Sequence, residues 1–149
     1  MKGKIVSINI SDKKGIRKKP IDNATIITDF GIENDAHASN QWHRQISLLA
    51  VESIKKVQDL GLNVKPGDFA ENITTEGLDL LSIPVGTRMK IGNVHVEVSQ
   101  IGKECHTRCS IYYQAGKCIM PSEGIFAKVI KGGEIKTGDT IEIDLHSSF

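Results

Sequence analysis

Residues 89–101, MKIGNVHVEVSQI, decide the fold class, because two β-prone runs flank the dipeptide Gly92-Asn93. A Gly-Asn pair between two such runs is typical of a tight β-hairpin turn. After the turn, valine recurs at every second position over residues 94–98, as expected for a strand with one buried face. The same alternation puts His95 on the solvent face. The segment therefore predicts an antiparallel hairpin.

Short strands of the same kind are predicted on both sides of this hairpin, separated by Gly-rich turns. Residues 47–60 are the best candidate for a helix, with apolar residues at helical spacing, Ser47 as the expected N-cap and Gly61 as the stop. Many short strands and one main helix favour a mainly β fold: a closed or partly open β-barrel of largely antiparallel strands with a long cysteine-bearing loop. The predicted strands are residues 4–10, 24–30, 89–91, 94–101, 125–130 and 140–145.

The composition is that of an ordinary globular chain. With 149 residues, 25% of them charged and a formal net charge of +1, the chain is expected to form one domain, residues 1–149, without the global field that would attract nucleic acid or a membrane. No apolar run has the length of a membrane span, and the N-terminus does not resemble a signal peptide. An odd number of cysteines in a chain without an export signal predicts a cytoplasmic location and free thiols.

One basic cluster stands out, because five of the seven residues from 13 to 19 are lysine or arginine. A charge run in a glycine-containing loop is usually a solvated surface. We therefore interpret residues 13–19 as a solvated loop, with a phosphate-binding patch as the alternative.

All three cysteines lie in residues 99–126, between the strands expected at 94–101 and 125–130. A long loop between two strands of a rigid scaffold is a common place for chemistry. Lys103 and Arg108 flank Cys105, and nearby positive charge favours the thiolate, which is the form that reacts or binds metal. We therefore predict a reactive or metal-ligating thiolate at Cys105.

Other interpretations of the cysteines stay open. A disulfide is disfavoured by the expected compartment. Cys118, beside two apolar residues, fits a buried and inert cysteine. A structural zinc site would use Cys105, Cys109, Cys118 and His106, although only the first two cysteines have a close spacing.

Two further segments concentrate polar side chains. Residues 31–45 contain Asp35, His37, His43 and Arg44, and the dipeptide Glu71-Asn72 follows a Pro-Gly-Asp turn. Taken singly, each has an ordinary explanation: a loop histidine is often solvated, and Glu-Asn is often a turn or cap. An arginine is either a surface charge or a planar clamp for phosphate or carboxylate.

Taken together, the order of these motifs resembles the MOSC domain, which is named for the C-terminal part of molybdenum cofactor sulfurases. The resemblance spans nearly the whole chain and is to the short stand-alone bacterial form. The matching residues are Gly31-x-x-x-Asp35-x-His37, His43-Arg44-Gln45, Pro66-Gly67-Asp68-Phe69-x-Glu71-Asn72, Gly77-Leu78, Val85-Gly86 and Val98-Ser99-Gln100-x-x-x-x-Cys105.

The resemblance implies a barrel-like fold with a site around Cys105, which would ligate molybdenum or carry sulfur as a persulfide. An arginine of this site would bind the phosphate of the pterin cofactor through two hydrogen bonds, and an amide or carboxylate would form hydrogen bonds with the polar groups of its ring. The residues expected to line the cleft or bind cofactor are Asp35, His37, His43, Arg44, Glu71, Asn72, His106 and Arg108.

The function implied is a module that binds molybdenum cofactor or carries sulfur for cofactor or metal–sulfur assembly. Its expected partners are a cysteine desulfurase or molybdenum-cofactor biosynthesis proteins, with pyridoxal phosphate only in a partner desulfurase. Two alternatives belong to other classes of protein. One is a molybdenum-dependent reductase of N-hydroxylated compounds that needs a separate electron donor, and the other is a zinc-stabilised, non-enzymatic interaction module.

Overall fold

The computed structural model of the chain describes residues 1–14, 16–102 and 123–143. These residues form a mainly β fold with one α-helix, α1 (Val51–Asp59), and one short 3-10 helix, η1 (Leu80–Ser82). The strands are β1 (Lys2–Ile10), β2 (Lys19–Ile21), β3 (Asn23–Ile27), β4 (Gly31–Ile32), β5 (Ile46–Ala50), β6 (Ile73–Glu76), β7 (Arg88–Ile91), β8 (Val94–Ile101), β9 (Ile125–Lys131), β10 (Gly133–Lys136) and β11 (Thr140–Ile143).

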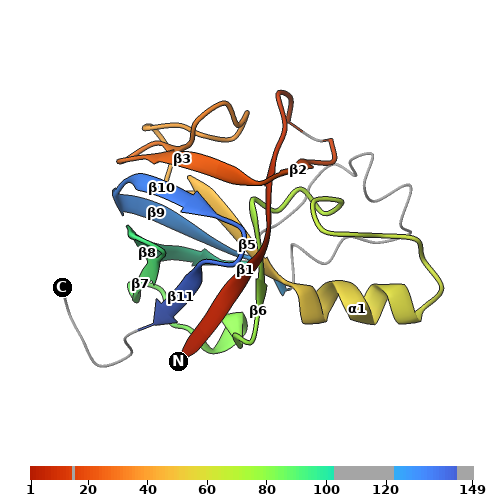
Figure 1. The fold of residues 1–149 in the computed structure, drawn as a ribbon. Helices are drawn as coiled ribbons and strands as arrows, with labels where there is room; N and C mark the ends of the chain where they lie inside the picture. Colours follow the sequence, from red (N-terminus) through yellow and green to blue (C-terminus); the bar gives the residue numbers. More distant parts are fainter. Residues whose placement is uncertain (15, 103–122, 144–149) are drawn as a thin grey trace.

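Seven strands close into a barrel. The larger sheet has the order β11-β7-β8-β9-β5-β6-β1-β2, and a further pairing of β11 with β1 closes the ring and leaves β2 outside it. Within the ring only β5 and β6 are parallel; the other neighbours are antiparallel. In Figure 1 these strands surround a common core and α1 lies outside them. The barrel predicted from the strand pattern is confirmed.

The hairpin of β7 and β8 has the predicted form. The valines of β8 at positions 94, 96 and 98 are buried, and the residues between them are only partly buried. Ile91 pairs with Val94 across the turn, where Gly92 has a φ of 57°, a conformation that glycine adopts without steric cost. Burial of each such aliphatic side chain stabilises the fold by roughly 1.5–3 kcal/mol.

The predicted helix over residues 47–60 is wrong at its start. Ile46–Ala50 is strand β5, paired with β6 on one side and β9 on the other, and all five of its residues are buried. A short run of buried apolar residues does not distinguish strand from helix by periodicity, so tertiary pairing decides. The helix begins only at Val51, and Ser47 is therefore not its N-cap.

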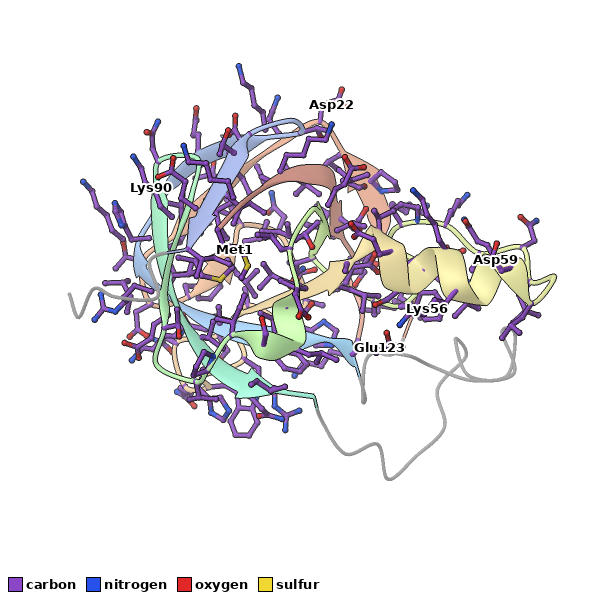
Figure 2. All side chains as sticks on the ribbon, turned by 90° about the horizontal axis from the view of Figure 1, so that it is seen from below. Met1, Asp22, Lys56, Asp59, Lys90 and Glu123 are labelled. Atoms are coloured by element: carbon purple, nitrogen blue, oxygen red, sulfur yellow. The ribbon has the colours of Figure 1, made fainter. Side chains whose placement is uncertain are left out.

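Helix α1 packs one face on the barrel and holds the returning chain. Ile54 and Val57 are buried in a small cluster with Phe69 and Phe126. On the same helix, Ser53 Oγ and Lys56 Nζ donate to Glu123 Oε1 at 2.9 and 3.0 Å; Figure 2 shows Glu123 beside Lys56. The chain that follows residues 103–122 thus joins the structure at α1.

A smaller sheet, in the order β10-β3-β4, supports the loop after β4. β3 ends at Ile27, earlier than the predicted 24–30, because the chain turns and Gly31 pairs back with Ile27. Gly31 has a φ of 131°, and a Cβ there would come within 2.5 Å of the Gln45 carbonyl oxygen. Among the described residues, no helix is long and apolar enough to cross a membrane.

Candidate functional site

A cavity of about 360 Å³ lies at the junction of the β1–β2 connection, the loop after β4, the first residues of β5, the loop before β6 and the start of β9. Its volume is within the range of small-molecule sites. Three predicted site residues, His37, Arg44 and Asn72, meet at its wall. The other wall residues with polar or aromatic groups are Lys14, Ser39, Trp42, Ser47, Phe69 and Phe126.

The segment that carries the cysteines leaves and rejoins the barrel next to this cavity. Gly102 N donates to Gly124 O at 2.7 Å, so the two ends of the segment emerge side by side. Gln100 pairs with the cavity residue Phe126 across β8 and β9. Three predicted site residues, Cys105, His106 and Arg108, lie outside the described residues, as do Cys109 and Cys118.

The loop that bears His37 and Arg44 is fixed to the barrel by the buried side chain of Gln45. Its Nε2 donates to Asp29 Oδ1 at 2.9 Å and to Ser39 O at 3.1 Å. Its Oε1 accepts from Val129 N at 2.9 Å. Gln45 was part of the family pattern, and its structural role depends on contacts that are distant in sequence.

Arg44 is held in one orientation at the cavity wall. Its guanidinium carbon lies 5.0 Å from the centre of the Trp42 ring and 5.3 Å from that of Phe126, both within cation–π range. Its Nε donates to Gln100 Oε1 at 2.9 Å. Because Nε is the donor used, the terminal nitrogens keep their planar pair of N–H groups for a ligand.

His43 also contacts Gln100 but is not among the cavity-wall residues. Its exposed ring lies 4.7 Å from that of Trp42, and its Nε2 lies 2.9 Å from Gln100 Oε1. Gln100 in turn donates from Nε2 to Gly102 O at 2.7 Å. Gln100 therefore links the arginine to the residue where the cysteine segment begins. The sequence indicates Gln100 only as part of a motif, because a glutamine at the end of a strand has no chemical signature of its own.

Asp35 lies beneath the cavity rather than at its wall. Its side chain is fully buried, and Oδ1 is 2.6 Å from the ammonium nitrogen of Lys18. Oδ1 and Oδ2 also accept from the backbone nitrogens of Ser11 and His37. Lys18 is itself buried, so the interpretation of residues 13–19 as a solvated loop is wrong at this position. Elsewhere in that loop, Lys14 reaches the cavity wall.

Asn72 closes the cavity floor by joining β1 to β5. Its Oδ1 accepts from Ser47 N at 3.0 Å and from Ser47 Oγ at 3.2 Å, and its Nδ2 donates to Asn9 O at 3.2 Å. All three residues are buried. Asn72 is thus more than the turn or cap considered from the sequence, because it connects strands that are far apart in the chain.

Glu71 points away from the cavity wall into the interior. Its Oε2 accepts from Gly67 N at 3.0 Å and from Thr74 Oγ1 at 2.6 Å, whereas Oε1 is buried without a partner among the described residues. Burial raises the pKa of Glu71 from 4.5 to about 7, against the opposing effect of these hydrogen bonds. Glu71 is therefore a neutral or easily neutralised carboxyl that shapes the loop before β6.

The Pro-Gly-Asp turn holds the basic segment. Lys18 N donates to Gly67 O at 2.8 Å, and a Cβ at Gly67 would come within 2.3 Å of the Lys18 carbonyl oxygen. Arg17 Nη1 lies 3.4 Å from Asp68 Oδ2. The glycine is therefore required by the close approach of two backbones, and the motif fixes the position of Lys18 beneath the cavity.

Comparison with solved structures identifies the same fold in three bacterial proteins. The YuaD protein from Bacillus subtilis is 22% identical, with a TM-score of 0.79 over 96% of each chain. YiiM from Escherichia coli is 19% identical, with a TM-score of 0.71 over 99% of this chain and 71% of its own. YiiM from Geobacillus stearothermophilus is 22% identical, with a TM-score of 0.72 over 95% and 75%.

At these identities the structural likeness shows the fold alone. A search of curated protein sequences finds no match. The family model of the MOSC domain, by contrast, matches residues 33–142, which include the loop after β4, the loop before β6 and the segment with the three cysteines. The chain therefore belongs to the MOSC domain family.

Proposed function

We propose that this protein binds molybdenum cofactor, or carries sulfur for its assembly, with Cys105 as the metal ligand or the persulfide acceptor. The observation that carries the proposal is the orientation of Arg44. Its guanidinium lies within cation–π range of two aromatic rings and donates to Gln100, at the end of β8 from which the cysteine segment leaves. Cys105 follows Gly102 by three residues, a span of at most about 11 Å.

The donor set at the cavity fits a pterin cofactor. Arg44 offers a planar fork suited to a phosphate, and Lys14 adds a second positive charge at the wall. His37 and the second N–H group of Asn72 Nδ2 supply polar groups for the ring, and the soft thiolate of Cys105 suits molybdenum. When bound, the cofactor would supply the metal centre for redox or sulfur chemistry. The residues of this chain would bind, orient and shield it.

In the sulfur-carrier form of the proposal, the thiolate of Cys105 attacks the terminal sulfur of a persulfide on a partner desulfurase. The bond between that sulfur and the desulfurase cysteine breaks, and the desulfurase cysteine leaves as a thiolate. Cys105 keeps the transferred sulfur, so the exchange needs no external oxidant or reductant.

The Cys105→Ser variant tests the proposal. Protein purified from a host with intact pterin synthesis should release pterin and molybdenum, and the variant should contain less than about a tenth as much. Even outer-shell partners of a metal are worth roughly 10- to 100-fold in affinity, so loss of the ligand should cost at least as much. The sulfur-carrier form predicts cyanide-labile sulfur on wild-type protein incubated with a cysteine desulfurase and cysteine.

Cys118→Ser is the matched control and should keep its pterin and labile sulfur. Wild-type protein that is as empty as Cys105→Ser would argue against the ligand role. Absence of cyanide-labile sulfur from both would argue against the carrier role as well.

Arg44→Lys should reduce pterin retention by roughly tenfold to a hundredfold. The change keeps the charge but removes the fork, and charge-assisted hydrogen bonds contribute about 1.5–3 kcal/mol each. Arg88→Lys is a suitable control, because Arg88 pairs with Glu97 between β7 and β8 and is not among the cavity residues. Equal pterin content in the two variants after identical dialysis would contradict the assignment of Arg44.

A further inference from the structure

A buried ammonium group underlies one wall of the cavity. The side chain of Lys18 is only 1% exposed, and three atoms of the described residues lie within hydrogen-bond distance of its Nζ. These are Asp35 Oδ1 at 2.6 Å, His37 Nδ1 at 2.9 Å and Ser11 Oγ at 3.2 Å. A lysine ammonium can donate a hydrogen bond to each of these three atoms.

The chemistry of this contact determines where the proton of His37 lies. An ammonium group donates hydrogen bonds and cannot accept them, so the facing nitrogen of His37 must be the acceptor. In a neutral imidazole one nitrogen accepts and the other carries the proton. With Nδ1 as the acceptor, the proton of neutral His37 is on Nε2.

The surroundings hold both partners in place. Ser11 Oγ donates to Lys13 O at 2.9 Å, which leaves its lone pairs for Lys18. Asp35 Oδ2 accepts from the backbone nitrogen of His37 at 3.3 Å, so the same carboxylate fixes the lysine and the loop that bears the imidazole. Asp35 is fully buried, which strengthens its interaction with the ammonium.

We propose that Lys18 is a positioning residue that holds His37 as an Nε2–H donor at the cavity wall. The cavity would therefore bind, at this wall, a ligand group that accepts a hydrogen bond, such as an oxo, phosphate or carbonyl oxygen. His37 Nδ1 is occupied by Lys18 and is not available as a metal ligand. The tautomer follows from the contact alone, whereas the role of the donor in ligand binding rests on the proposed function.

Nitrogen NMR of the full-length, ligand-free protein tests the tautomer. At about pH 8, where an ordinary imidazole is neutral, His37 should show a protonated Nε2 and an acceptor Nδ1. The ammonium protons of Lys18 should exchange slowly and correlate with His37 Nδ1. Lys18→Met/Asp35→Asn should lose the correlation.

A protonated Nδ1 in wild-type His37 would overturn the inference, even if the variants fail to fold. For the ligand role, pterin retention should fall roughly three- to tenfold in Lys18→Met/Asp35→Asn relative to Asp35→Asn, as expected for loss of one oriented hydrogen bond. Equal retention would overturn that role. Wild-type protein without pterin would contradict the proposed function and leave the NMR result as the test of the tautomer.

Discussion

Replacing Glu71 with glutamine is expected to stabilise the folded protein above about pH 7 and to remove a large part of its pH dependence. Burial raises the pKa of the Glu71 carboxyl from 4.5 to about 7, so the folded chain binds this proton more tightly than the unfolded chain. Glutamine has nearly the shape of the neutral carboxyl, and its oxygen can accept the hydrogen bonds from Gly67 and Thr74. It carries no charge at any pH.

The direction of the effect follows from proton binding. Below pH 4.5 Glu71 is protonated in both states, and its contribution to the free energy of unfolding is at its most favourable. Between pH 4.5 and about 7 only the unfolded chain releases the proton, so this contribution falls as the pH rises. Above that range both states are ionised and the contribution is constant. The difference between a pKa of 4.5 and a pKa of about 7 corresponds to about 3 kcal/mol.

Urea unfolding of wild type and Glu71→Gln across this pH range measures the effect, because other titrating groups cancel in the difference. The difference in unfolding free energy should change by about 3 kcal/mol in favour of the variant between pH 4.5 and about pH 8. Glu76→Gln is the control: the Glu76 side chain is partly exposed and, among the described residues, forms a surface ion pair with Lys4. A difference for Glu71→Gln that does not vary with pH would show that the carboxyl ionises normally in the fold.

The hairpin around Gly92 could be predicted because the residues that determine it are close together in the sequence. Alternating valines and a turn glycine act within about ten residues, and the structure follows them. Strand β5 differs because its identity depends on β6 and β9, which lie far away in the chain. The sequence around Leu48 and Leu49 is equally compatible with the start of a helix. It forms a central strand because it pairs with β6 on one side and β9 on the other.

The residues of the candidate site also differ in how far the sequence predicts their positions. Family motifs indicated which residues belong to the region, and Arg44 and Asn72 do reach the cavity. The motifs do not predict how deeply each side chain is buried. In the structure, Asp35 and Glu71 are buried beneath the cavity. Lys18 was the hardest case, since a lysine in a basic run is normally solvated. Its partner Asp35 lies 17 positions further along the chain.

The Lys18→Met variant should lose about 3–5 kcal/mol of stability, which is the usual cost of removing one partner from a buried ion pair. The methionine fills much of the lysine's volume but leaves the Asp35 carboxylate with two backbone N–H donors, from Ser11 and His37, and without a counter-charge from the described residues. A buried charge without compensation is costly in the low-dielectric interior.

Lys18→Met/Asp35→Asn should recover most of this loss, since the pair then carries no charge and the asparagine oxygen can still accept from Ser11 N. Urea unfolding of the wild type, both single variants and the double variant at neutral pH gives the coupling energy between the two positions, expected to exceed about 2 kcal/mol. Arg17→Met, at a partly exposed ion pair with Asp68, provides the comparison for loss of a neighbouring cation. If Lys18→Met cost no more than that variant, or if the double variant were no more stable than Lys18→Met, the ammonium would not be what neutralises Asp35. The structural basis for the tautomer of His37 would then be lost as well, because the same nitrogen makes both contacts.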